Sequence, residues 1–117
     1  MWNVVLLEEV DAWFLELARA SDPVAEQVAA AIELLARSGP SLGRPVVDPI
    51  KGSTVHNLKE LRASTVRVLF VFDPARKAIL LVAGDKAGRW DEWYRTNVPV
   101  AERRYERWLS GEYDEEV

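Results

Sequence analysis

The sequence predicts an α+β fold in which one antiparallel sheet carries helices on one side, in the order β-α-α-β-β-β-α. Between His56 and Lys86 the chain holds three β-type runs, Leu58–Arg62, Val66–Phe72 and Ala78–Ala83. The loops between these runs are so short that only hairpins can connect them, which makes the paired strands antiparallel. Apolar residues at helical spacing lie before and after this segment, so helices precede and follow the three strands.

A strand and two helices are expected before this segment. Trp2–Leu7 is apolar and rich in β-branched residues, which favours a first strand. Two apolar stripes with i, i+3, i+4 and i+7 spacing follow, one ending near Ala20 and the other near Gly39. We expect Asp22 to cap the second helix and Pro23 to be its first residue. Because the link is short, the two helices should form an antiparallel helical hairpin packed on one face of the sheet.

The other segments are a loop and a C-terminal helix. Residues 38–54 hold three prolines and three glycines, which is typical of a loop. After the last strand, Gly88–Thr96 is expected to form a short helical turn, and a last helix should begin near Pro99 and end at Gly111. Residues 112–117 form an acidic tail that we expect to be disordered. The apolar residues expected to hold the 38–54 loop on the body are Leu42, Val46, Val47 and Ile50.

Composition limits the class of protein. With 117 residues, 49% hydrophobic and 29% charged, the chain is expected to be one globular domain, 1–117. No apolar run approaches the ~20 residues of a membrane span. Acidic residues follow directly after the first short apolar run, which is unlike a secretory signal. The lack of cysteine excludes disulfides and thiolate chemistry and favours a cytoplasmic protein.

The distribution of charge is more informative than its sum. The formal net charge is −4, yet only three of the 15 basic residues lie within residues 1–50, and the other twelve follow. Such asymmetry can mark a basic working face on an acidic body. Solvated acidic faces on the two helices would give the same pattern.

Several chemistries are excluded by the residue inventory. With one histidine and no cysteine, a zinc site would have to be built from carboxylates. No Walker A, GxGxxG or GxSxG motif is present, and His56 alone does not support a Ser-His-Asp triad. We therefore expect neither a metal nor a cofactor.

Arg67 is the most informative residue of the chain. It interrupts the otherwise apolar run VRVLFVF, where a charge is costly unless it faces solvent, a partner or a ligand. Other cations lie on or at the ends of the same strands, and aromatic residues follow them. Guanidinium groups bind phosphate bidentately, and aromatic rings stack on unpaired bases. The residues of this candidate RNA site are Lys59, Arg62, Arg67, Lys86, Arg89, Trp90, Trp93 and Tyr94, with His56 as a further candidate for proton transfer.

RNA carries its own nucleophile, the 2′-hydroxyl. A protein need only align it, remove its proton, neutralise the phosphate charge and protonate the leaving oxygen, which requires no metal. A structural interpretation is also open. Trp90 and Trp93 would then be core residues, and Arg67 would be paired with an acid such as Asp85 or Glu60.

The register of the first hairpin is not determined by the sequence. If its loop is Ala63–Thr65, Lys59 and Leu61 share a face with Arg67. A slip of one residue places Glu60 and Arg62 there instead, because side chains alternate between the two faces.

Four segments together resemble the RelE/HigB-type toxins of bacterial type II toxin–antitoxin systems, in their HigB-like, phage-related branch. These segments are LKELR at Leu58–Arg62, VRVLFVFDP at Val66–Pro74, ILLVAGDK at Ile79–Lys86 and WYRTNVPVAERRY at Trp93–Tyr105. The resemblance implies a RelE-like fold and an mRNA endonuclease acting in the ribosomal A site. It also implies an antitoxin partner from the same operon, often with a helix-turn-helix domain.

The resemblance also implies roles for single residues. Arg62 matches the arginine that closes the family's KLR-type strand, and Arg67 matches the arginine assigned to the scissile phosphate. Lys86 matches the basic residue after the last strand, and Tyr94 lies near the family's C-terminal aromatic. The two strand lysines of RelE-like enzymes are replaced here by Leu58 and Glu60, which leaves Lys59, His56 and Lys86 as candidates for the general base.

Two other functions stay open at this stage. The ParE branch shares the fold but inhibits gyrase by binding. Glu60, which replaces a strand lysine of RelE-like enzymes, is compatible with that alternative. A decayed toxin that retains only antitoxin binding would also fit the sequence.

Overall fold

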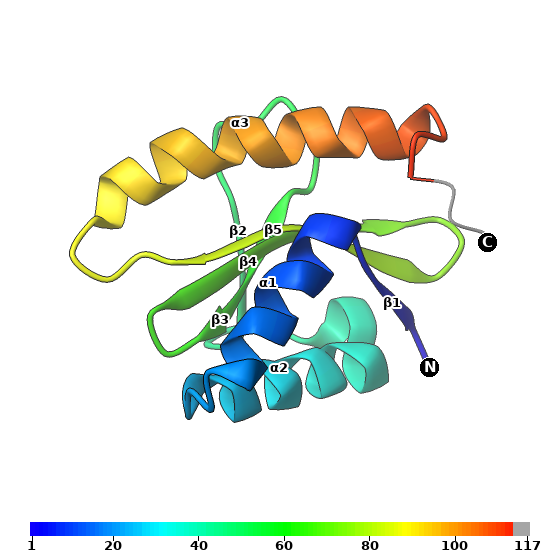
Figure 1. The fold of residues 1–117 in the computed structure, drawn as a ribbon. Helices are drawn as coiled ribbons and strands as arrows, with labels where there is room; N and C mark the ends of the chain where they lie inside the picture. Colours follow the sequence, from blue (N-terminus) through cyan, green and yellow to red (C-terminus); the bar gives the residue numbers. More distant parts are fainter. Residues whose placement is uncertain (114–117) are drawn as a thin grey trace.

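The structure is a computed structural model, and it describes residues 1–113. In this part of the chain a five-stranded sheet with the order β1-β5-β4-β3-β2 is packed against helices (Figure 1). The α+β class and the chain order are confirmed, with one short strand, β2, added to the expected set. The elements are β1 (Asn3–Leu6), α1 (Glu8–Arg19), α2 (Val24–Ser38), the 3₁₀ turn η1 (Gly39–Ser41), β2 (Val47–Pro49), β3 (Lys59–Ala63), β4 (Val66–Asp73), β5 (Lys77–Asp85) and α3 (Trp90–Leu109).

The sheet is antiparallel except at one edge. The pairs β2–β3, β3–β4 and β4–β5 are antiparallel, as the short loops predict. β1 lies parallel to β5, with Asn3 opposite Lys77 and Leu6 opposite Leu80. The sheet is therefore mixed, because the long connection through α1 and α2 allows a parallel return that no hairpin could make.

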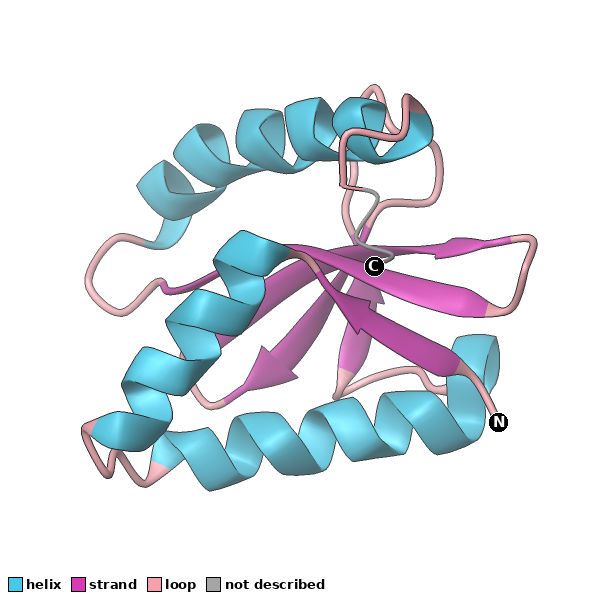
Figure 2. Cartoon of the chain, turned by 45° about the vertical axis from the view of Figure 1, so that its right-hand side comes forward, coloured by secondary structure: helices cyan, strands magenta, loops and turns pink. Residues whose placement is uncertain are grey.

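Helices cover both faces of the sheet, so the expectation of helices on one side is wrong. Figure 2 shows α1 and α2 on one face and α3 on the other. The reason lies in β4, whose residues alternate between two apolar clusters. Val68 and Phe70 pack with α1 and α2, whereas Leu69 and Val71 pack with Trp93 of α3. A strand that is apolar on both faces needs a cover on each.

The C-terminal helix is continuous from Trp90 to Leu109, so the predicted break near Pro99 is wrong. Proline removes one hydrogen bond of the helix ladder. Packing outweighs that loss, because Trp93 and Ala101 on either side of Pro99 are both buried. Trp93 also lies directly against the backbone of β5, where a Cβ on Gly84 would come within 2.7 Å of the indole nitrogen.

The joints between elements agree with the local sequence signals. The Asp22 carboxylate accepts a hydrogen bond at 3.0 Å from the N–H of Val24, the first residue of α2, so Asp22 lies at the helix start as expected although α2 begins one residue later, with Pro23 at the N-cap position. Leu42, Val46 and Val47 pack on the cluster beneath α1 and α2, and Ile50 packs on the other cluster, as predicted.

Two residues of the predicted tail are in contact with the body. The Tyr113 hydroxyl donates to Glu9 Oε2 at 2.9 Å, and Arg107 lies over the Tyr113 ring. Glu112 accepts from Arg107 Nε at 3.2 Å. The expectation of a free tail is therefore wrong for residues 112 and 113, and its remainder, 114–117, lies outside the described residues.

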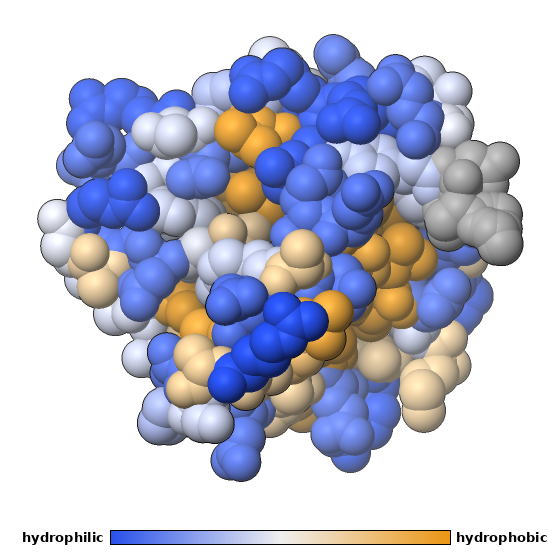
Figure 3. Space-filling model, in the orientation of Figure 1, coloured by the Kyte–Doolittle hydropathy of each residue, from blue (hydrophilic) through white to orange (hydrophobic). Residues whose placement is uncertain are grey.

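The surface of the face shown in Figure 3 is predominantly polar, with apolar patches between polar side chains. Within residues 1–113, no helix combines the length and the apolar character that crossing a membrane would need.

Candidate anion-binding site

A two-residue turn fixes the register of the hairpin β3–β4. Ser64 adopts a positive φ of 58°, and Arg62 pairs directly with Arg67 across the strands. Glu60 and Arg62 therefore share the face of Arg67, which is the face covered by α3. The alternative register, with Lys59 and Leu61 on that face, is wrong.

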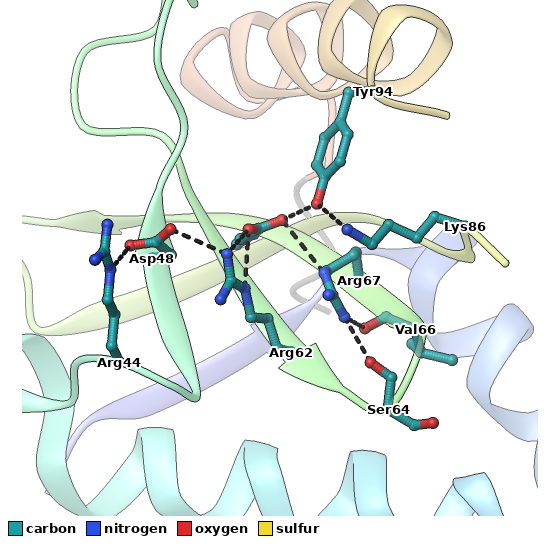
Figure 4. Close-up of polar contacts among 9 residues, drawn as sticks. Arg44, Asp48, Arg62, Ser64, Val66, Arg67, Lys86 and Tyr94 are labelled. Carbon is teal, nitrogen blue, oxygen red and sulfur yellow. Dashed lines mark hydrogen bonds and ion pairs between the residues drawn. The ribbon is translucent and has the colours of Figure 1, made fainter. Parts of the chain in front are cut away.

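Three charged residues in the described part of the chain are almost fully buried, and all three lie at this end of the sheet. Glu60 is 3% exposed, Lys86 5% and Arg67 7%. Figure 4 shows Arg62, Arg67 and Lys86 lying along the sheet, with Tyr94 reaching down from α3. Buried charges must be paired, and here the pairing partner is a single carboxylate.

The Glu60 carboxylate is the centre of the group. Its Oε2 accepts from Arg62 Nε at 3.0 Å and from Arg62 Nη2 at 2.8 Å, so two charged donors converge on one oxygen. Its Oε1 accepts from the Tyr94 hydroxyl at 2.5 Å and lies 3.6 Å from Arg67 Nε. Glu60 thus holds side chains from β3, β4 and α3 together.

Arg67 is fixed in place by its own hairpin. Its Nη1 donates to the Ser64 carbonyl at 2.7 Å and to the Val66 carbonyl at 2.9 Å. Within residues 1–113, its buried Nε has no hydrogen-bond partner, since Glu60 Oε1 is too far away and already accepts from Tyr94. The guanidinium is therefore held rigidly, with one donor directed at Glu60 and unused.

Lys86 and Tyr94 form a second pair beside the arginines. Lys86 Nζ donates to the Tyr94 hydroxyl at 3.2 Å and lies 3.9 Å from the centroid of the Trp90 ring. Burial, together with the nearby Arg67 charge, lowers the pKa of Lys86. Burial and the hydrogen bond to Glu60 raise the pKa of Tyr94 to about 12. At neutral pH Tyr94 therefore keeps its proton, while Lys86 releases its proton more readily than an ordinary lysine.

The outer end of the group is open to solvent. Arg62 Nη2 also donates to Asp48 Oδ2 at 3.0 Å, and Asp48 is bound by Arg44 at 2.6 Å. The side chain of Arg62 is 32% exposed, compared with 4% for Glu60. The hydrogen bonds to Glu60 raise the pKa of Arg62, so its guanidinium stays protonated. Arg62 is thus the member of the group that an incoming anion meets first.

The other predicted site residues lie in different parts of the structure. Arg89 and Trp90 are exposed at the start of α3, and Trp90 touches the group through Lys86. Lys59 lies on the opposite face of β3, paired with Phe70. His56 is exposed in the loop that Ser53 and Thr54 tie to Glu102 of α3. Trp93 is 2% exposed and belongs to the core.

The central position of Glu60 was not predicted from the sequence. In the sequence Glu60 stood out only as a departure from a family pattern and as one possible partner of Arg67, whereas in the structure it contacts three side chains, those of Arg62, Arg67 and Tyr94. A signal was available, because an acid two residues before an arginine on one strand lies on the same face and can pair with it.

This geometry defines a class of protein. The protein is a small RelE-like α+β domain with rigid cations buried under the start of its last helix, an arrangement suited to holding one oxyanion.

The chain belongs to the family described as phage derived protein Gp49-like (DUF891), whose model matches residues 15–106 and so spans all residues of the candidate anion-binding site. It is 54% identical over 112 residues to “Putative toxin HigB3” of Mycobacterium tuberculosis (strain ATCC 25618 / H37Rv), covering 94% of this chain and 96% of that protein. It is 46% identical over 109 residues to “Putative toxin HigB2” of the same organism, covering 89% of this chain and 53% of that protein. The chain thus spans about half the length of HigB2.

Proposed function

We propose that this protein is the toxin of a type II toxin–antitoxin system, and that it cleaves mRNA on the ribosome by attack of the 2′-hydroxyl, without a metal. The observation that carries the proposal is the group of Arg67, Lys86, Arg62 and Tyr94 on a RelE-like sheet, of which Arg67 and Lys86 are almost fully buried. The names of two relatives that align with nearly all of this chain, HigB3 and HigB2, support the toxin assignment.

Arg67 is assigned to the scissile phosphate. Charge builds on the non-bridging oxygens as the 2′-oxygen attacks, and a rigid donor placed there in advance stabilises this charge without reorganisation. The two carbonyls that hold Arg67 Nη1 provide that rigidity. Arg62, at the solvent edge, binds the same or the adjacent phosphate.

Lys86 and Tyr94 are assigned to proton transfer and orientation. Because its pKa is lowered, the Lys86 ammonium is a better proton donor to the leaving 5′-oxygen than an ordinary lysine. Tyr94 stays protonated at neutral pH, so its hydroxyl accepts from Lys86 and donates to an anion, and it is assigned to positioning Lys86 or the phosphate. Arg89 and the exposed Trp90 ring are placed to bind the flanking phosphate and base.

The general base stays open between Lys86 in its neutral form and His56. Lys59 lies on the other face of β3, so its part in this chemistry would require a different strand register in the RNA-bound protein.

The proposed partner is an antitoxin from the same operon, of helix-turn-helix type. We expect it to contact the acidic body formed by α1, α2 and the loop around Leu42–Ile50, the basic site, or both. Coexpression of the two genes should give one complex by size exclusion. Separate elution of two folded proteins would contradict this partnership.

One observation favours the alternative of a toxin that acts by binding gyrase. Glu60 already neutralises the arginines that an RNA phosphate would need. A binding toxin, or a decayed one that retains only antitoxin binding, has no need of free cations at this place.

The deciding experiment is to express the chain with and without the neighbouring gene and to map mRNA ends. New 5′-hydroxyl ends in translated mRNA, absent when the partner is coexpressed, are the expected result. DNA damage that precedes any change in mRNA would favour gyrase inhibition. Retention of cleavage by purified protein in EDTA, on ribosomes that tolerate it, tests the metal-independent chemistry.

A further inference from the structure

The Glu60 carboxylate lies where a bound phosphate would be expected to lie. Its Oε2 accepts from both Nε and Nη2 of Arg62, while its Oε1 accepts from Tyr94 and faces Arg67 Nε. Arginine donates to phosphate oxygens from the same Nε and Nη2 edge, so a phosphate placed between Arg62 and Arg67 would use the donors that Glu60 now uses.

The contacts of Arg67 show that its hydrogen-bonding capacity is not fully used. Arg67 is buried, its Nη1 is held from behind by two carbonyls, and within the described residues its Nε lacks a hydrogen-bond partner. At 3.6 Å from Arg67 Nε, Glu60 Oε1 forms an ion pair with Arg67 but no hydrogen bond, whereas Glu60 does hydrogen-bond Arg62 and Tyr94. An anion approaching the Nε edge of Arg67 meets the Glu60 carboxylate.

Resting on the function proposed above, we propose that Glu60 is an internal counter-anion that occupies the phosphate site, so that an RNA phosphodiester binds by displacing its carboxylate from Arg62 and Arg67. Glu60 keeps the two guanidinium groups aligned while the site is empty. It also makes binding to stray RNA weak, because each binding event must first break the contacts that Glu60 makes.

Asp48 supplies a matched control. It is also a carboxylate hydrogen-bonded to Arg62, at 3.0 Å, but its other partner is Arg44, and no contact joins it to Arg67 or Tyr94. Glu60→Gln and Asp48→Asn each add one unit of positive charge to the same neighbourhood. Only Glu60→Gln removes the group that competes for the phosphate position.

The test measures binding of a fluorescein-labelled, fully 2′-O-methylated single-stranded RNA on the order of ten nucleotides long, which cannot be cleaved by 2′-hydroxyl attack. Glu60→Gln should bind it about tenfold more tightly than the wild type, the value of one charge-assisted hydrogen bond. Asp48→Asn should gain clearly less, and adding Arg67→Ala to Glu60→Gln should abolish the gain. Equal gains from the two single variants, no gain from Glu60→Gln, or a gain that survives Arg67→Ala would each overturn the proposal.

A second measurement uses the wild type, in case Glu60→Gln does not fold. The same RNA is titrated into isotope-labelled protein, and the Glu60 carboxyl carbon and the Arg67 Nε–H resonances are followed. Both should shift along the same saturation curve. A shift of Arg67 with an unmoved Glu60 carboxyl would overturn displacement.

The binding readout is independent of cleavage. Tighter binding by Glu60→Gln, with no new mRNA ends from the wild type, would support the counter-anion and contradict the endonuclease. Cleavage by the wild type, with unchanged binding by Glu60→Gln, would do the reverse.

Discussion

The two faces of the β3–β4 hairpin differ sharply in the residues that they carry. On the face toward α1 and α2, Leu61, Val66, Val68 and Phe70 are all buried and apolar. On the face toward α3, the same strands begin with Glu60, Arg62 and Arg67 and become apolar only from Leu69 onward. One face is a core along its whole length, and the other is a core that ends in a charged site.

The difference shows how one strand can contribute to the core with one face and carry a candidate binding site on the other. Residues alternate between faces, so a charge at Arg67 leaves Val66 and Val68 undisturbed on the other side. The apolar face keeps the hairpin rigid, and that rigidity holds the guanidinium in place. The four predictions below would break or sharpen this comparison.

The largest effect is expected on the apolar face. Phe70→Asp places a charge at a fully buried position and should cost more than about 4 kcal/mol of unfolding free energy, or prevent folding. Chemical denaturation of the purified variant measures it. Lys59→Gln, at the half-buried partner position across the strands, is the control and should change stability by less than about 1 kcal/mol. A melt unchanged by Phe70→Asp would refute the strand assignment.

On the charged face, Arg67→Ala should act on cleavage more than on folding. Loss of one preorganised donor costs roughly 10²–10³ in rate, about 3–4 kcal/mol. Arg67→Lys should recover little, since an ammonium cannot replace a planar fork. Cleavage rate per folded molecule and the melting temperature are measured on the same sample. Intact cleavage together with a large loss of stability would remove Arg67 from the site.

Substitutions of two lysines, Lys86 in the charged group and Lys59 on the opposite face, test the difference between the faces directly. Lys86→Ala should lower the cleavage rate by about 10²-fold, the low end for loss of an acid–base group, whereas Lys59→Ala should leave it nearly unchanged. If the Lys86 ammonium is the acid, the rate falls as pH rises through its pKa, which lies below the ordinary 10.5. A pH–rate profile on wild type and Lys86→Arg checks this. An equal loss in both alanine variants would contradict the assignment by face.

The smallest effect is expected where α3 ends. Tyr113→Phe removes only the hydroxyl that donates to Glu9, and should cost about 1 kcal/mol. Truncation after Gly111 should cost more than that, because it also exposes the surface that the Tyr113 ring buries. Thermal melts of both variants decide it. A truncated chain as stable as the full one would show that the Tyr113 contact contributes nothing.

Much of this architecture follows from the sequence, and the failures have identifiable causes. Short loops and β-type runs predict the three central strands, and helical spacing predicts α1 and α2. Register could not be predicted, because β4 is apolar on both faces and its pattern favours neither. The break predicted at Pro99 was wrong because the buried residues around it hold the helix together. The parallel pairing of β1 depends on a contact with residues more than seventy positions away, which no local pattern reports.

The candidate site was predicted in part. Arg67 stands out as a charge in an apolar run, and the structure does place Arg62, Lys86 and Tyr94 beside it. Whether these residues act on RNA stays a prediction. The arrangement around Glu60 could not be predicted, because it depends on the register of the hairpin and on the position of α3 above it.

The parallel edge of the sheet has a consequence for how the chain is made. β1 is synthesised before its partner β5, which spans Lys77–Asp85, so β1 stays unpaired in the nascent chain until β5 has been made. The site assembles later still, since Tyr94 must emerge before Glu60 and Lys86 acquire their shared contact. Long-range pairing of this kind is slow compared with local helix formation. The contacts of Glu60 with Tyr94 therefore cannot form until the residues through Tyr94 have been synthesised.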